Sequence, residues 1–197
     1  MSRRDDSRGS EYIELDNAAT AYLLGSRGAT KQRLADFTGC QLEIGHSRVE
    51  LIGRQEEREL ARMCVEITLQ QRNGSGRGTI EYDELERRED CSTIDVPQPA
   101  VGFLLGAKGA TLRQMETKHR VFMFFDNDKI RDSRSGPAKR LYVLGGSRDR
   151  DRVMAEAEEA IAFKTTGVGR GPRPGGGGAA AGVAPVCRTV LAGERVL

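Results

Sequence analysis

Residues 23–30 read LLGSRGAT, and residues 104–111 read LLGAKGAT. Six of these eight positions are identical, and the other two exchange one small or one basic residue for another. Each copy places Gly-x-x-Gly between two helix-forming stretches, and glycine has the backbone freedom that a sharp turn between helices needs. The repeat indicates an internal duplication.

The similarity continues on both sides of this motif. Three further pairs of segments align between the copies: 13–15 with 94–96, 40–44 with 121–125, and 49–53 with 141–145. The last pair lies 11 residues further apart than the others. The second copy therefore carries an insertion, which predicts a long loop over residues 126–140.

Each copy predicts the same order of elements: strand, helix, helix, strand, strand, helix. In the first copy, hydrophobic periodicity, caps and glycines predict a strand at 12–15, helices at 17–24 and 29–37, strands at 40–44 and 48–52, and a helix at 55–69. The second copy repeats this order between residues 92 and 163. The expected fold class is α+β, with two tandem domains that each pack a three-stranded sheet against three helices.

Composition divides the chain into five segments. Hydrophobic residues make up 38% of the 197 residues and 24 are glycine, so part of the chain is expected to lie outside any packed core. We predict a disordered N-terminus at 1–10, domains at 11–72 and 91–164, a flexible, acidic linker at 73–90, and a disordered Gly-, Pro- and Ala-rich tail at 165–197.

Charge and cysteine usage exclude several classes of protein. Lys and Arg total 31 against 29 Asp and Glu, and the net charge of +2 is too small for a polycation that coats nucleic acid. The four cysteines are scattered and only His46 and His119 accompany them, so no metal site is expected. The sequence contains no catalytic constellation, so we expect no enzyme activity, no cofactor and no small-molecule substrate.

The N-terminus and the hydropathy pattern bear on location. Residues 1–10 are polar and have no apolar core for a signal peptide, and no stretch approaches the ~20 apolar residues of a membrane helix. We therefore expect an intracellular protein without a membrane partner. Nucleus and cytoplasm are equally compatible with the sequence.

The Gly-x-x-Gly loop has a clear chemical use. The helix that follows it presents free amide groups and the positive end of its dipole, and Arg27 or Lys108 adds a cation. These features suit a phosphodiester backbone. Four neighbouring leucines are expected to floor a shallow groove for bases: Leu23, Leu24, Leu104 and Leu105. The alternative is an ordinary turn between two helices.

On these residues the chain resembles the type I KH domain, a family of RNA-binding modules. The second copy carries the resemblance at residues 96–97 and 101–109, Leu112 and Met115, and the first at Leu34, residues 38–40, Leu42 and Ile44. The resemblance extends over residues 11–70 and 91–164. It implies two tandem KH domains that bind single-stranded RNA in two grooves, in the regulation or processing of mRNA after transcription. The alternatives are a protein-interaction scaffold that keeps the fold without RNA, and a binder of single-stranded DNA.

The resemblance also implies which residues contact RNA. They are Leu23, Leu24, Gly25, Ser26, Arg27, Gly28, Lys31, Leu42, Ile44, Val101, Gly102, Leu104, Leu105, Gly106, Ala107, Lys108, Gly109, Leu112, Met123 and Arg140. Lys31 stands where the family has a buried aliphatic residue. It either extends to solvent or adds a cation near the phosphates.

Three further segments leave alternatives open. Phe122 and Phe124 alternate with the core-facing residues of their strand, so they are either covered by a neighbouring segment or form a surface for the other copy or for a protein partner. Residues 126–140 form either the second jaw of the RNA groove or a solvated insertion. The tail is either a linker or adds a weak contact with RNA or with another protein.

Overall fold

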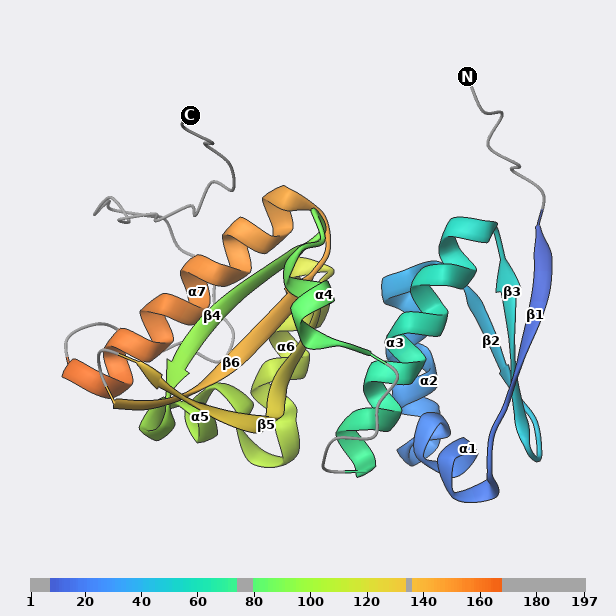
Figure 1. The fold of residues 1–197 in the computed structure, drawn as a ribbon, viewed down its shortest axis with the longest axis horizontal. Coiled ribbons are helices and arrows are strands. Elements are labelled where there is room, and N and C mark those ends of the chain that lie inside the picture. The colour runs from blue at the N-terminus through green and yellow to red at the C-terminus, as the bar shows by residue number, and fades with distance from the viewer. Residues whose placement is uncertain (1–7, 74–79, 134–135, 168–197) are drawn as a thin grey trace, which may run out of the picture.

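The computed structural model describes residues 8–73, 80–133 and 136–167. Figure 1 shows two units side by side, each with helices packed on a sheet. The predictions of disorder cover residues 1–10 and 165–197, of which 1–7 and 168–197 lie outside the described residues. They are wrong for Gly9 and Ser10, which belong to a strand, and for residues 165 and 166, which end the last helix.

The first unit contains β1 (Gly9–Glu14), α1 (Asn17–Leu24), the 3-10 turn η1 (Ser26–Gly28), α2 (Ala29–Thr38), β2 (Gln41–Ile44), β3 (Arg48–Gly53) and α3 (Gln55–Asn73). Its antiparallel sheet has the order β1-β3-β2. At the start of α1 the amide of Ala19 donates a 2.6 Å hydrogen bond to the Asp16 carboxylate. Gly39 ends α2 in the left-handed region, at φ 71°.

The second unit contains α4 (Tyr82–Glu86), β4 (Cys91–Pro97), α5 (Gln98–Leu105), η2 (Ala107–Gly109), α6 (Ala110–His119), β5 (Phe122–Ser133), β6 (Gly136–Leu144) and α7 (Ser147–Thr166). Its sheet order, β4-β6-β5, is the same as in the first unit. The predicted α+β class and the order strand, helix, helix, strand, strand, helix are therefore confirmed in both units. The structure adds α4 before the second copy.

One face of each sheet packs against the three helices of its own unit. Burial alternates along the strands of the first sheet, where Leu42 and Leu51 are fully buried while Gln41 and Glu43 are exposed. Successive side chains of a strand point to opposite faces, so this alternation sets the core face. The second unit buries Val143 and its neighbours against α5, α6 and α7 in the same way.

The insertion in the second copy is a long hairpin and not a loop. β5 and β6 stay paired from Phe122 opposite Leu144 out to Ser133 opposite Gly136, with a register shift between Phe125 and Ile130. The prediction of a loop over residues 126–140 is therefore wrong. Backbone pairing in a hairpin needs no apolar alternation, and the charged sequence of this segment lacks the pattern that marks a strand.

The segment before β4 is folded. Leu85 of α4 is only 3% exposed, and the ring of Tyr82 stacks on Tyr142 with 5.3 Å between ring centroids. Glu86 accepts 2.8 Å hydrogen bonds from the Tyr142 hydroxyl and from Arg140. The prediction of a flexible linker is therefore wrong for residues 80–90, because two apolar side chains three positions apart anchor the acidic segment.

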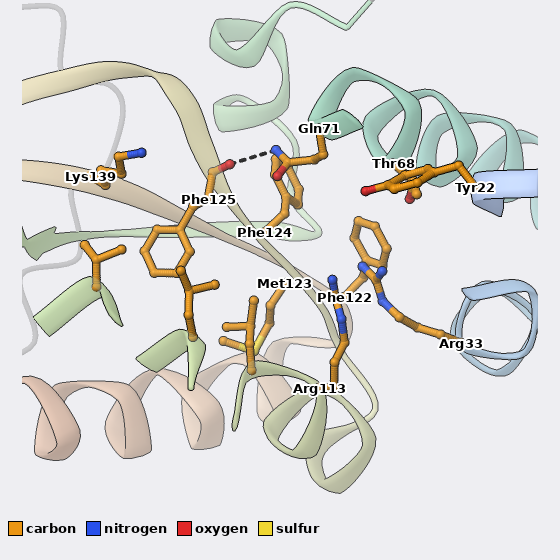
Figure 2. A pocket seen from close by; sticks show the side chains of 13 residues that line it. Tyr22, Arg33, Thr68, Gln71, Arg113, Phe122, Met123, Phe124, Phe125 and Lys139 are labelled. Atoms are coloured by element: carbon orange, nitrogen blue, oxygen red, sulfur yellow. Dashed lines mark hydrogen bonds between the residues drawn. The ribbon is translucent and has the colours of Figure 1, made fainter. Parts of the chain in front are cut away.

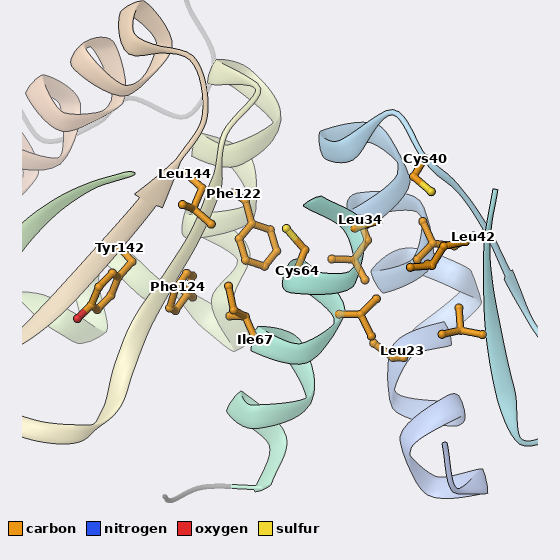
Figure 3. Close-up of a cluster of buried hydrophobic side chains, with 14 of the residues drawn as sticks. Leu23, Leu34, Cys40, Leu42, Cys64, Ile67, Phe122, Phe124, Tyr142 and Leu144 are labelled. Carbon is orange, nitrogen blue, oxygen red and sulfur yellow. The ribbon is translucent and has the colours of Figure 1, made fainter. Parts of the chain in front are cut away.

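The two units share a hydrophobic core (Figure 3). Cys64 and Ile67 of α3 pack against the outer face of the second sheet. That face carries four buried side chains: Phe122, Phe124, Tyr142 and Leu144. The first unit thus covers this face. Of the alternatives that the sequence leaves open for Phe122 and Phe124, the structure therefore agrees with a contact between the two copies, and the two buried rings do not form a surface for an outside protein partner.

Polar contacts also join the two units beside this hydrophobic core. The Gln71 side-chain amide on α3 donates a 2.7 Å hydrogen bond to the backbone carbonyl of Phe125. Arg33 of α2 lies 4.4 Å from the centroid of the Phe122 ring and 3.1 Å from the Glu116 carboxylate on α6. Burial lowers the pKa of the Arg33 guanidinium, because desolvation disfavours its charge. The neighbouring Glu116 carboxylate compensates part of that cost.

Candidate nucleic-acid interface

The first glycine of each loop has a backbone that is nearly restricted to glycine. Gly25 lies at φ 68° and ψ 179°, and Gly106 at φ 67° and ψ −174°. A Cβ on either glycine would also overlap the hydroxyl oxygen of the following threonine, Thr30 or Thr111. The first glycine therefore sets the turn.

The second glycine leaves open space in front of α2 and α6. Gly28 and Gly109 both lie at φ 80° and are the N-cap residues of these helices. A Cβ on either one would meet no described atom within 4 Å. The amide of the first helical residue, Ala29 or Ala110, donates to the carbonyl of Ser26 or Ala107. Because glycine has no side chain to cap the helix, the space in front of the helix start still has room for an outside anion such as a phosphate, which the positive end of the helix dipole favours.

Each loop presents one cation beside this helix start. Arg27 (φ 55°) and Lys108 (φ 53°) both adopt the left-handed conformation, and both residues are exposed. Ser26 and Ala107, the residues before them, are exposed as well. The two loops therefore share a backbone and a charge pattern that fit one phosphate group each.

We expect the two glycines of the second loop to differ in their effect on stability. Gly106→Ala lowers the free energy of unfolding by about 2–3 kcal/mol, because it combines backbone strain with the overlap at Thr111. Gly109→Ala lowers it by about 1 kcal/mol, because it has the strain alone. Urea denaturation of the two variants measures the difference, and equal losses would contradict this assignment.

A groove lies beside the loop of the second unit. Figure 2 shows this cavity, which has a volume of about 170 Å³. We call it the second-unit groove. Its apolar lining comes from α5, α6 and β5 and comprises Val101, Leu105, Leu112, Phe122, Met123, Phe124 and Phe125, of which Met123 is fully buried. Lys139 of β6 adds a cation. An apolar lining with a cation beside it suits a nucleobase whose backbone runs along η2.

The structure brings together only some of the residues expected to contact RNA. Val101, Leu105, Leu112 and Met123 all line the second-unit groove. By contrast, Leu23, Leu42 and Leu104 are at most 1% exposed. These three side chains lie in the core beneath the surface and cannot form a floor for bases. The helix and strand periodicity that identified them marks the buried face.

The surface next to the loops includes several other expected residues. Leu24 is 44% exposed, and Ile44 at the end of β2 is half-buried. Gly102 is exposed, and a Cβ on it would meet no described atom within 4 Å. A polymer can therefore approach the backbone of α5 closely at this position.

An ion pair crosses the corresponding region of the first unit. The Lys31 ammonium on α2 lies 3.3 Å from the Glu43 carboxylate on β2. Hydrogen bonds from Gln41 and Lys31 lower the pKa of Glu43 below its usual value. Lys31 is thus a half-buried cation that reaches the surface and is paired with a carboxylate. At the matching positions the second unit has Leu112 and Phe124, so its groove is apolar.

Arg140 does not extend into the groove as an unpaired cation. Its guanidinium lies 2.8 Å from Asp95 on β4 and 2.8 Å from Glu86 on α4. These hydrogen bonds raise its pKa above the usual range. The expectation that Arg140 contacts RNA is corrected on this basis, because its charge is used to join β4, β6 and α4.

Sequence reasoning missed the first unit's contribution to this site. Four residues of the first unit also line the cavity: Tyr22, Arg33, Thr68 and Gln71. Tyr22 is 41% exposed. The sequence holds no signal for them, because they reach the groove only through packing between the units.

Two other features, a metal site and a membrane-spanning helix, are absent from the described part of the chain. Among residues 8–73, 80–133 and 136–167, no group of three or more His, Cys, Asp or Glu side chains is arranged to hold a metal ion. Within the same residues, no helix combines the length and the apolar character needed to cross a membrane.

Comparisons with known proteins agree with this geometry for the second unit. Residues 92–160 match the family model described as the KH domain. The match begins within β4 and ends within α7, so the chain carries a KH domain there. A comparison with curated proteins found no match.

Among solved structures, the chain is similar to the first KH type I domain of human vigilin. The two are 16% identical with a TM-score of 0.34, and the match covers 41% of this chain and 90% of that domain. Dim2p from Pyrococcus horikoshii OT3 is 16% identical with a TM-score of 0.31, covering 81% of this chain and 94% of the other. A chain of the a/eIF2alpha–aDim2p–rRNA complex from the same organism is 16% identical, with a TM-score of 0.30 and coverages of 83% and 90%.

Proposed function

We propose that this protein binds single-stranded RNA and that its main site is the second-unit groove. The observation that carries the proposal is the uncapped start of α6, with open space and the exposed Lys108 in front of it, next to a cavity whose walls are partly apolar and partly basic. Phosphates lie along η2, where the helix start and a cation receive them. Bases enter the groove, where their edges are within reach of the backbone of β5.

We propose that the first unit is a second, weaker KH domain, in tandem with the domain that forms the second-unit groove. Its sheet order and the backbone angles of its loop match those of the second unit. The Lys31–Glu43 pair places a carboxylate across its groove, which repels phosphate and costs affinity. In the cell we propose a role in the regulation or processing of mRNA after transcription.

Binding of matched oligonucleotides tests this function. Fluorescence anisotropy of the full chain with labelled oligo(U), oligo(A) and oligo(C) RNA, and with DNA of matched sequence, compares the ligands directly. We expect at least one RNA to bind, and to bind more tightly than its DNA counterpart. Preference for DNA favours the single-stranded DNA alternative, and binding of neither favours the protein scaffold.

Salt dependence reports how many phosphates the protein contacts. We expect about three contacts, from Arg27, Lys108 and Lys139, because Lys31, Arg113 and Arg140 are paired with carboxylates. For a single strand, each phosphate contact contributes about −0.7 to the slope of log affinity against log salt, so we expect a slope of about −2. A slope steeper than about −6 would mean that residues outside the described surface dominate as a polycation. Anisotropy titrations at four salt concentrations measure it.

A further inference from the structure

Tyr22 occupies an unusual place at the boundary of the two units. It lies near the end of α1 in the first unit, and its side chain is 41% exposed. It lines the second-unit groove, and it also lines a cavity of about 680 Å³ between α2 and α6. Figure 2 shows the Tyr22 ring beside Thr68 of α3, with Phe122 and Arg33 nearby. The two cavities are therefore adjacent at this ring.

The walls around Tyr22 are positively charged overall. Four cations and two carboxylates line the two cavities: Arg33, Arg113, Arg120 and Lys139, with Asp36 and Glu116. Arg72 adds a guanidinium 6.0 Å from the Tyr22 ring centroid. This excess of positive charge favours the phosphates of a nucleic acid that passes from one cavity to the other.

We propose that a single-stranded RNA bound in the second-unit groove continues across the boundary and stacks one further base on Tyr22. The inference rests on the proposed function and adds a subsite that only the two packed units form. An exposed aromatic ring at the end of an apolar groove matches the way single strands are bound, by stacking of successive bases along a basic surface.

The packing between the units holds Tyr22 in this place. The hydrogen bond from Gln71 to the carbonyl of Phe125 ties α3 to the strand that lines the groove. Thr68, on the same helix, is buried and lines both cavities with Tyr22. The second unit alone would therefore end its binding surface at Phe125 and Leu105, and would bind a shorter RNA.

A tryptophan in place of Tyr22 gives a direct test, because the chain contains no tryptophan. Tyr22→Trp is titrated with the best-binding oligonucleotide in two lengths, about four and about eight nucleotides. We expect the longer RNA to quench the fluorescence by stacking and the shorter RNA to leave it nearly unchanged. Tyr12→Trp is the matched control, since Tyr12 is an exposed tyrosine on β1 and should respond to neither RNA.

Affinity gives the second readout. Tyr22→Ala is expected to weaken the longer RNA about tenfold and the shorter RNA only about twofold, because Tyr22 lines the far end of the groove, while Tyr22→Phe keeps the affinity of the longer RNA. Equal weakening of both lengths, or tight binding of the longer RNA without quenching, would overturn the subsite but not the proposed function. If neither RNA binds the parent chain, the proposed function fails and the subsite fails with it. Unchanged circular dichroism confirms that each variant is folded.

Discussion

Replacing Ala107 and Lys108 with aspartates lowers RNA affinity at least about 100-fold while the protein stays folded. Both residues are exposed at the tip of the second loop, in front of the uncapped start of α6. The change removes the cation and adds two carboxylates where we place a phosphate, and about 2.7 kcal/mol of binding free energy corresponds to this loss. Aspartate tolerates the left-handed backbone at position 108 better than most residues. Fluorescence anisotropy measures the loss of RNA affinity, and thermal denaturation checks that the protein stays folded.

The first loop supplies the matched control. Aspartates at Ser26 and Arg27 make the same change of charge on the same backbone. We expect a smaller loss there, because the Lys31–Glu43 pair already weakens that groove. Equal losses at the two loops would mean that both grooves bind alike. Unchanged affinity of the variant at 107 and 108 would refute the second-unit groove as the main site.

Local sequence was sufficient to predict the elements of each unit. The turn at Gly25 and Gly106 needs a backbone that glycine alone adopts readily, and the chain has glycine at both places. Leu42 and Leu51 mark the core face of their strands because burial alternates with period two. These are short-range effects, and a sequence pattern records short-range effects well.

Such patterns could not predict how the two units pack against each other. Phe122 and Phe124 show in the sequence as an extra apolar face, but the sequence does not say that α3 covers it. The acidic segment before β4 carries Tyr82 and Leu85, and two side chains are too few for a periodic signal. Contacts between segments far apart in the chain depend on three-dimensional complementarity, which no local period encodes.

Local sequence patterns likewise predict only some of the residues of the candidate site. The loop residues Arg27 and Lys108 could be predicted because the Gly-x-x-Gly turn places them locally. Leu23 and Leu104 were misplaced, since an apolar residue beside a loop can face either the core or the groove. Tyr22 enters the site only through the packing of one unit on the other.

Phe124 connects this packing to stability. Its ring is 4% exposed, stacks on Tyr142 at 5.1 Å between centroids, and lies 6.2 Å from the Tyr82 ring. Truncation leaves a cavity among these rings that rigid strands fill poorly, so Phe124→Ala lowers the free energy of unfolding by about 3–5 kcal/mol. Urea denaturation measures it. Tyr12→Ala is the control, because that ring is 51% exposed and its loss changes stability by about 0.5 kcal/mol or less.

A variant at Ile67 separates the two parts of the proposed site. Ile67 of α3 is 1% exposed and packs in the same cluster as Phe124, but unlike Phe124 it does not line the second-unit groove. A cavity at Ile67 loosens the attachment of α3 and with it the position of Tyr22. Ile67→Ala should therefore keep most of its affinity for an RNA of about four nucleotides and lose the gain from a longer one. If the variant loses less than about 1 kcal/mol of unfolding free energy, the packing of the two units does not depend on this contact. If the short RNA is weakened as much as the long one, the second unit does not hold its groove without the first.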